Sequence, residues 1–170
     1  MIMTDIEVYG SYLPWGLKVI RHNNLEYGLT VTGVTLSELQ LATARRVDDI
    51  IRVPWLHSSD NKPILRSLRT LDKSITENGN LFLPVDEFKI GGDDNHMVDY
   101  GRGTVRLNGL LKDMATHNFI HFEYLNYGII LKLLQWHFDI YGWIEQGKAI
   151  DVAMLPKNPY AEKQITQKTT

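Results

Sequence analysis

Hydrophobic and polar residues alternate in the N-terminal part of the chain in a pattern typical of β-strands. Within residues 16–43, the stretch "LKVI" runs into a turn signal, "HNN", and "EYGLTVTGVT" then alternates Thr with Val. β-Branched side chains in alternation suit a half-buried pleated surface. We therefore expect a small antiparallel sheet in the N-terminal half. A further strand, or a loop back onto the sheet, could cover "SELQLATARRVDDIIRV", and the strand order stays open.

The next stretch, "SSDNKPILRSLRTLDKSITENGN", predicts an amphipathic helix near residues 62–77. Asp60 or Asn61 can cap its start, and Pro63 fits its first turn, where its missing N–H would be unpaired in any case. The Asn-Gly pair at 78–79 suits the left-handed exit of a helix. Apolar residues follow the spacing of three and four that gives a helix an apolar stripe: Leu65, Leu68 and Ile75, with Leu71 beside them.

The apolar spacing in the second half predicts another helix, near residues 126–141. On a helical wheel, five apolar residues fall on one line: Leu125, Ile129, Leu133, Trp136 and Ile140. His137 falls within the apolar arc, whereas Asp139 lies roughly 160° away, on the side that must face water. The two side chains therefore do not pair within this helix. We interpret His137 as a hydrogen-bonded core histidine, and a catalytic role would need a partner from elsewhere in the chain.

Two further stretches carry little hydrophobic pattern. "GGDDNHMVDYGRGTVRLNG" is rich in glycine and acidic residues and predicts a long mobile loop. "PKNPYAEKQITQKTT", residues 156–170, predicts a flexible C-terminal tail. We expect residues 1–155 to form a single α+β domain, in which the small sheet packs against a few helices.

The composition narrows the class of protein. A chain of 170 residues, 44% hydrophobic and 22% charged, can bury the core of one domain. The absence of cysteine excludes a disulfide-stapled secreted fold, thiol catalysis and cysteine-ligated zinc. A formal net charge of -2 means that any affinity for nucleic acid must come from a local patch. Neither a signal-peptide pattern nor a membrane-spanning apolar run is visible, so we expect a cytoplasmic protein without a membrane partner.

Candidate residues for chemistry are few. His117 and His121 are four apart, a spacing that would align two imidazoles for a metal on a helix, but the glutamate of the metalloprotease motif is missing. In a strand they would simply share one polar face. The acids of the glycine-rich stretch lack the spacing of a calcium loop, and no P-loop, dinucleotide fingerprint or nucleophile elbow occurs. We therefore predict no catalytic residues, no metal and no cofactor.

The charge pattern of the first predicted helix is the best positive signal. Lys62, Arg66, Arg69 and Lys73 recur at intervals of four, three and four residues, which on a helix forms a basic stripe opposite the apolar one. Cations spaced about one turn apart can follow a phosphate backbone or dock on an acidic protein surface. The alternative is an ordinary solvated helix face. Two further basic residues that could contribute to the same surface lie shortly upstream, Arg45 and Arg46.

Three segments stand together in a recognisable order: "YLPWGLKV" (12–19), "KPILRSLRTLDKSITENGNLFLP" (62–84) and "LLQWHFDIYGWIEQGKAIDV" (133–152). They are similar to a family of small proteins encoded by phages and prophages of Bacteroidetes bacteria. In that family a proline often stands where this chain has Ser67, and another where it has Asn126, which affects helix starts rather than chemistry. The resemblance supplies no enzymatic activity and no catalytic residues.

The resemblance implies a context, which is that of a phage-encoded accessory protein that acts by binding inside a bacterial host. Anti-defence proteins, anti-CRISPR inhibitors among them, belong to this population. The expected partner is a bacterial host protein, with a CRISPR effector nuclease as one candidate, contacted through its surface or its guide RNA. Two alternatives stay open: a small metal-dependent phage hydrolase or nuclease that uses His117, His121, His137 and the loop acids, and a virion or replication component.

Overall fold

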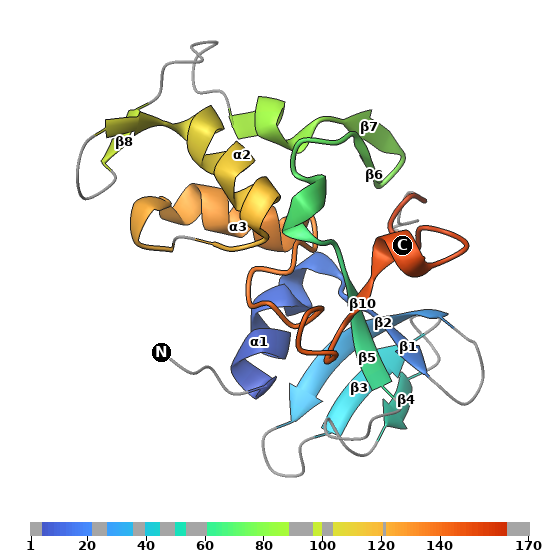
Figure 1. Cartoon of the computed structure of the whole chain (residues 1–170). Coiled ribbons are helices and arrows are strands. Elements are labelled where there is room, and N and C mark those ends of the chain that lie inside the picture. Colours follow the sequence, from blue (N-terminus) through green and yellow to red (C-terminus); the bar gives the residue numbers. More distant parts are fainter. Residues whose placement is uncertain are drawn as a thin grey trace, which may run out of the picture.

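The molecule has a β-sheet at one end and helices at the other (Figure 1). Helices α2 (Leu107–His117) and α3 (Tyr127–Gln135) lie far from the sheet, and α1 (Asp5–Tyr12) lies between them and the strands. The predicted α+β class is confirmed. The computed structural model describes residues 5–21, 27–35, 40–44, 50–53, 61–88, 97–99, 104–120 and 122–162.

The main sheet confirms the predicted antiparallel arrangement in the N-terminal half. Its strands are β1 (Lys18–Arg21), β2 (Tyr27–Thr35), β3 (Gln40–Ala44), β4 (Ile50–Val53), β5 (Asn61–Leu65) and β10 (Ile150–Asp151). They are ordered β10-β5-β1-β2-β3-β4. All neighbours pair antiparallel except β10, which runs parallel to β5. One edge of the sheet is therefore supplied by a segment from near the C-terminal end of the described residues.

The helix predicted near residues 62–77 is wrong. This stretch forms strand β5, the 3₁₀ turn η2 (Leu68–Thr70) and strand β6 (Ile75–Glu77). β5 has a partner strand on each side, and Ile64 and Leu65 are both fully buried. Consecutive residues of such a strand face apolar surroundings on both sides of the sheet.

The leucines of this stretch explain why it resembles a helix. The described structure buries Leu65, Leu68 and Leu71 alike, the first in β5 and the others at η2. The 3₁₀ turn has a period of three residues, so a buried strand followed by such a turn reproduces helical spacing. Ser67 is the N-cap of η2, because its Oγ accepts a hydrogen bond from the Arg69 N–H at 3.2 Å. Ser67 therefore begins a single 3₁₀ turn.

The Asn-Gly pair at 78–79 forms a hairpin turn instead of a helix exit. β6 pairs antiparallel with β7 (Asn80–Phe82), and the φ angles of Asn78 and Gly79 are 50° and 78°. Two consecutive positive φ angles are what a two-residue type I′ hairpin requires. The left-handed backbone was thus expected correctly, but in the wrong element. A 3₁₀ helix, η3 (Pro84–Phe88), follows the hairpin.

Part of the stretch predicted as a mobile loop is regular structure. β8 (Met97–Asp99) pairs antiparallel with β9 (Thr104–Arg106), and α2 begins at the next residue, Leu107. For these residues the loop prediction is wrong. Residues 89–96 and 100–103 lie outside the described part of the chain.

The hydrophobic core joins the helices to the sheet. α2 and α3 each bury one apolar face against the same cluster. The Tyr12 hydroxyl at the end of α1 donates a hydrogen bond to the Phe138 carbonyl at 2.6 Å, deep in the core. The largest fully buried side chains include Leu17, Leu110, Leu111, Met114, Leu133 and Phe138.

The helix predicted near residues 126–141 is confirmed in its first half and ends early. Asn126 caps α3, since its Oδ1 accepts a hydrogen bond from the Ile129 N–H at 3.0 Å. The helix ends in a Schellman motif: the Phe138 N–H donates to the Leu133 carbonyl and the His137 N–H to the Leu134 carbonyl, both at 2.9 Å. His137 takes the left-handed position of this motif with φ of 60°, where glycine is the usual residue.

Because the helix ends there, the orientation predicted for Asp139 is wrong. Asp139 is buried instead of facing water, with an exposed fraction of 4%. Its carboxylate accepts hydrogen bonds from the Trp143 N–H at 2.9 Å and the Ile144 N–H at 2.7 Å. It therefore holds the turn that follows α3 and, as expected, does not pair with His137.

The segment after residue 155 is held against the sheet as far as it is described. Tyr160 is 3% exposed, and its hydroxyl donates to the Ile64 carbonyl at 2.6 Å. The N–H groups of Asn78 and Gly79 donate to the carbonyls of Tyr160 and Ala161, both at 2.8 Å. Residues 163–170 lie outside the described part of the chain. Within the described residues, every helix is too short or too polar to cross a bilayer.

Candidate functional site

The four basic residues of the predicted stripe do not share a helix face. Lys62 is half-buried in β5, and Arg66, just after that strand, is 3% exposed. Arg69 in η2 and Lys73 shortly beyond it are exposed. The helical stripe is therefore wrong, because a strand and a 3₁₀ turn replace the helix on which it depended. Of the four side chains, Arg69 and Lys73 present a charge to solvent.

Arg66 is the centre of a buried polar cluster. Its Nη1 lies 2.8 Å from Glu77 Oε2 and donates to the Trp136 carbonyl at 2.7 Å. Its Nη2 donates to the Thr76 carbonyl at 2.9 Å, and the guanidinium carbon lies 5.0 Å from the centre of the Tyr160 ring. A buried charge is tolerated when an opposite charge and hydrogen bonds surround it. These contacts join β6, the end of α3 and the C-terminal segment around one side chain.

His137 completes this cluster. Its ring stacks on Tyr160 with centroids 3.9 Å apart, and its Nε2 lies 3.0 Å from the Trp15 carbonyl. Its Nδ1 has no hydrogen-bond partner and faces Glu77 Oε1 at 3.8 Å. Burial lowers the pKa of His137 below its ordinary value of 6.5, although the facing Glu77 carboxylate opposes this change. His137 is therefore neutral at pH 7.

The cluster is closed to substrates. The exposed fractions of Arg66, Glu77, His137 and Tyr160 are 3%, 6%, 1% and 3%. Burial also raises the pKa of the Tyr160 hydroxyl well above its ordinary value, so this group stays protonated. A general base or nucleophile needs access to the reacting atom. The arrangement favours a structural role for all four residues, as expected for His137.

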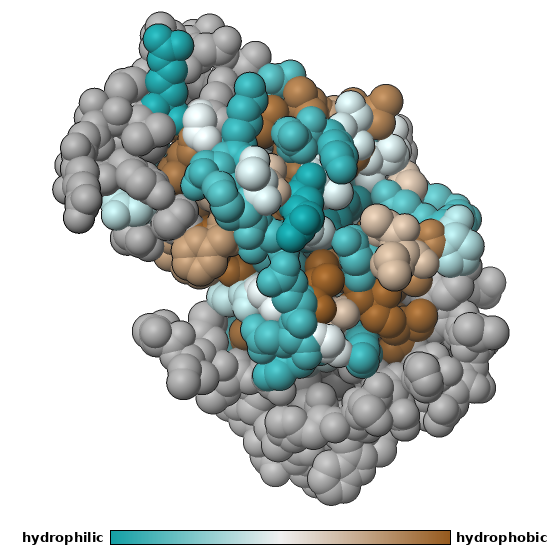
Figure 2. Space-filling model, viewed as in Figure 1, coloured by the Kyte–Doolittle hydropathy of each residue, from teal (hydrophilic) through white to brown (hydrophobic). Residues whose placement is uncertain are grey.

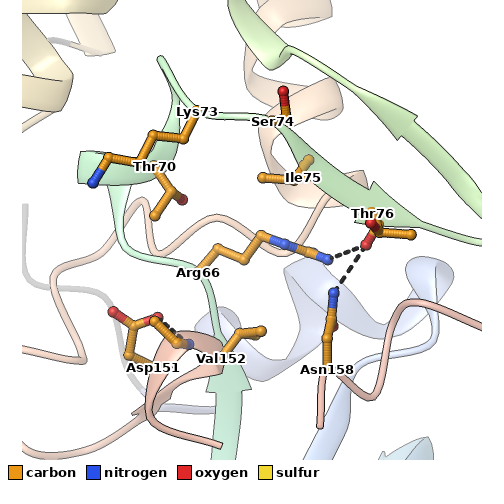
Figure 3. Close-up of a pocket in the computed structure, with 10 residues that line it drawn as sticks. Arg66, Thr70, Lys73, Ser74, Ile75, Thr76, Asp151, Val152 and Asn158 are labelled. Carbon is orange, nitrogen blue, oxygen red and sulfur yellow. Dashed lines mark hydrogen bonds between the residues drawn. The ribbon is translucent and has the colours of Figure 1, made fainter.

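An open pocket of about 290 Å³ lies directly beside this cluster (Figure 3). Thr70 and Lys73 lie on one side of it and Asp151 and Val152 on the other, and the Arg66 side chain runs between them toward Thr76. The remaining lining residues are Ser74, Ile75, Thr76, Ala153 and Asn158. η2 and β6 therefore form one wall, and the segment after β10 forms the other.

The charged side chains in this pocket and next to it in the chain differ in their contacts, and of the two exposed cations Lys73 lines the pocket whereas Arg69 does not. Arg69 Nη2 lies 3.9 Å from Glu145 Oε1, and both side chains are more than half exposed, so solvent screens this pair. Among the described residues the Lys73 ammonium has no ion-pair partner. The Asp151 Oδ1 accepts a hydrogen bond from the Ala153 N–H at 3.0 Å. The pocket thus has on one wall a cation without an ion-pair partner in the described part of the chain, and a carboxylate on the other.

The histidine pair predicted as a weak metal candidate is only half described. His117 lies exposed at the end of α2, where its Nδ1 is 3.0 Å from the carboxylate of Asp113. Four residues named above lie outside the described part of the chain: Arg45, Arg46, Asp60 and His121. Within the described residues, no three His, Asp or Glu side chains gather as metal ligands would.

Comparisons with protein-family models, with curated proteins and with solved structures find no match to this chain. The site therefore has to be interpreted from its own geometry.

Sequence reasoning missed the pocket because its two walls are distant in the chain. One wall comes from residues 70–76 and the other from residues 151–158. The second wall carries a local signal, since Asp151 caps the 3₁₀ turn η5 (Val152–Met154). The position of this turn beside β6 depends on the pairing of β10 with β5, which the sequence pattern does not reveal.

Proposed function

We propose that this chain is a non-enzymatic accessory protein that acts by binding a macromolecular partner. The context is the one that the family resemblance implies: a phage-encoded protein in the cytoplasm of a bacterial host. The proposed partner is a host defence protein, with an RNA-guided CRISPR nuclease as the first candidate. Binding would inhibit it, so the protein would act as an anti-defence factor.

The observation that carries this proposal is the exposure of Arg69 and Lys73 on one short segment beside an open pocket. Lys73 lines this pocket and Arg69 is exposed in the same segment, and exposed cations can supply charge complementarity to an acidic surface. The side chains that could act in catalysis have structural surroundings instead. His137 and Glu77 are buried, and the Asp139 carboxylate holds a turn. These contacts favour binding over catalysis.

A cleavage assay tests the proposal. A purified Bacteroidetes CRISPR nuclease is loaded with guide RNA and incubated with increasing amounts of the protein before target DNA is added. We expect cleavage to fall in a dose-dependent way when the protein is present before the target. A panel of host nucleases of different types that all cleave at undiminished rates would contradict the anti-defence role.

The same experiment distinguishes the proposed binding protein from the alternative, a metal-dependent nuclease. The protein is incubated alone with DNA and with RNA in the presence of magnesium or manganese. Cleavage by the protein itself would favour a nuclease over a binding protein. Stable DNA and RNA together with inhibited host nuclease would support the proposal.

A further inference from the structure

We infer that the pocket beside Arg66 takes an apolar side chain from an acidic segment of the protein partner. This inference rests on the proposed function, because it names the chemistry of the partner that the proposed binding protein would recognise. It is carried by the contents of the two walls, the size of the pocket and the Lys73 ammonium, for which the described residues supply no ion-pair partner.

The centre of the pocket is suited to an apolar group. The guanidinium of Arg66 is already surrounded by the carboxylate of Glu77 and two backbone carbonyls, so its charge is not available to a ligand. What remains for the ligand is the aliphatic stem of Arg66, with Ile75 on one wall and Val152 on the other (Figure 3). A long charged side chain commonly presents its methylene groups as apolar surface in this way.

The size of the pocket favours an anchor over a complete small molecule. Its volume of about 290 Å³ lies at the lower limit of pockets that hold drug-sized ligands. A side chain that enters a pocket near the centre of an interface is the usual form of a binding hot spot. One aliphatic side chain, such as leucine, therefore fits the space better than a cofactor.

The rim selects the charge of the partner. The Lys73 ammonium is exposed and has no ion-pair partner among the described residues, and Arg69 has only a solvent-screened contact with Glu145. Lys73 lines the η2 side of the pocket, so an acidic residue next to the apolar anchor would meet its ammonium group there. Asp151, on the opposite wall, would accept hydrogen bonds from the N–H groups of the same segment.

The same rim disfavours RNA as the occupant. Single-stranded RNA is held by a continuous basic groove and by aromatic rings on which bases stack. None of the described residues that line the pocket is aromatic, so the pocket offers no ring on which a base could stack. Figure 2 shows hydrophobic and hydrophilic residues side by side on the face of the molecule that is viewed in Figure 1.

The test is a titration of the ¹⁵N-labelled full chain with defined peptides. The first probe is a capped peptide with a central leucine flanked on both sides by aspartate and glutamate. The second has alanine instead of leucine, and the third has lysine instead of every acidic residue. A short single-stranded RNA is the fourth. We expect saturable chemical-shift changes at the pocket residues with the first probe, and binding at least about tenfold weaker with the second and third.

Two substitutions with matched controls locate the site. Ala153→Phe fills the pocket from an exposed position, and its control is Met154→Phe at the next residue, which is 80% exposed and does not line the pocket. Lys73→Glu removes the free cation, and its control is Lys112→Glu on the exposed face of α2. We expect Ala153→Phe and Lys73→Glu to weaken binding of the first peptide about tenfold, and the controls to bind like the wild type.

Three outcomes would overturn the inference: no saturable binding of any peptide, equal binding of the acidic and the basic peptide, or unchanged binding by Ala153→Phe. RNA binding at the pocket residues would replace protein by nucleic acid as the occupant. The cleavage assay keeps the proposed function separate. If Ala153→Phe inhibits the nuclease as strongly as the wild type, the pocket inference fails and the binding function stands. If the acidic peptide binds but no nuclease is inhibited, the pocket inference stands and the proposed anti-defence function fails.

Discussion

Arg66 and Glu77 form an ion pair with 2.8 Å between Nη1 and Oε2, and their side chains are only 3% and 7% exposed. This pair separates Arg66 from the exposed basic residues of the predicted stripe. Arg66 belongs to the interior and joins three segments of the fold. Arg69 and Lys73 face solvent and are available to a partner. Substitutions in the Arg66–Glu77 pair are expected to change stability, and substitutions of Arg69 and Lys73 to change binding.

Glu77→Ala should destabilise the protein by about 3–5 kcal/mol, because it leaves the Arg66 charge buried without its counter-ion. Urea denaturation of the purified variant measures the loss. Glu87→Ala is the matched control, since Glu87 is an exposed acid of η3 and its replacement should change the free energy of unfolding by no more than about 0.5 kcal/mol. Equal effects of the two substitutions would show that the Arg66–Glu77 pair contributes nothing specific.

The pKa of His137 predicts a pH-dependent stability. The groups that face its ring are Glu77 from β6, Arg66 after β5, and Tyr160 and the Trp15 carbonyl. Burial lowers the folded-state pKa of His137 below 6.5, so the unfolded chain binds the proton more readily. The contribution of neutral His137 to the free energy of unfolding is therefore complete above about pH 6.5. It falls as the pH drops from there toward the folded-state pKa of His137.

Denaturation curves from pH 7.5 to 5.5 for the wild type and for His137→Asn test this. Asparagine tolerates the left-handed backbone but does not titrate. The stability advantage of the wild type should shrink on acidification by up to about 1.4 kcal/mol per pH unit. Asp139 and the other titrating groups that do not contact His137 are common to both proteins, so their contributions cancel in the difference. A difference that does not change with pH would mean that His137 is not the titrating group.

The backbone at His137 predicts an unusual order of two substitutions. With φ of 60°, a residue with a Cβ is strained there, so His137→Gly should be more stable than His137→Ala by about 1 kcal/mol. Gln135, two residues earlier in α3, supplies the control, because in a regular helix alanine is more stable than glycine by about 0.5–1 kcal/mol. The same order at both positions would contradict the Schellman ending of α3.

Tyr160→Phe should cost about 1–3 kcal/mol. The hydroxyl donates to the Ile64 carbonyl at 2.6 Å and accepts from the Lys18 N–H at 3.1 Å, and its loss leaves buried backbone groups without a partner. Tyr127→Phe, at a tyrosine that is 73% exposed, should change the free energy of unfolding by less than about 0.5 kcal/mol. If Tyr160→Phe is equally silent, the segment around Tyr160 does not stabilise the sheet as described.

Elements with a local signature could be predicted from the sequence. The Thr and Val alternation of β2 reflects the period of a strand and was interpreted correctly, as was the start of α3, where Asn126 caps the first turn. The stretch 62–77 failed because a buried strand and a 3₁₀ turn space their leucines as a helix does. The end of α3 failed because His137 occupies a position where glycine is the usual signal.

The candidate site was predicted only in part, because burial depends on distant partners. Nothing next to Arg66 in the sequence distinguishes it from Arg69. Its burial follows from Glu77 in β6, Trp136 at the end of α3 and Tyr160 in the C-terminal segment, which tertiary packing brings together. The exposed pair of cations was found by its charge, while the pocket beside it required the pairing of β10 with β5.

The most direct test of the proposed binding function is a charge reversal in the nuclease cleavage assay. The double substitution Arg69→Glu/Lys73→Glu is compared with Arg106→Glu/Lys112→Glu, which makes the same change in net charge at exposed positions beside α2. Denaturation midpoints of both variants are measured to confirm that each is folded. We expect the first variant to lose inhibition of the nuclease at an unchanged midpoint, and the second to inhibit like the wild type. Full inhibition by the Arg69→Glu/Lys73→Glu variant would contradict the assignment of this surface to partner binding.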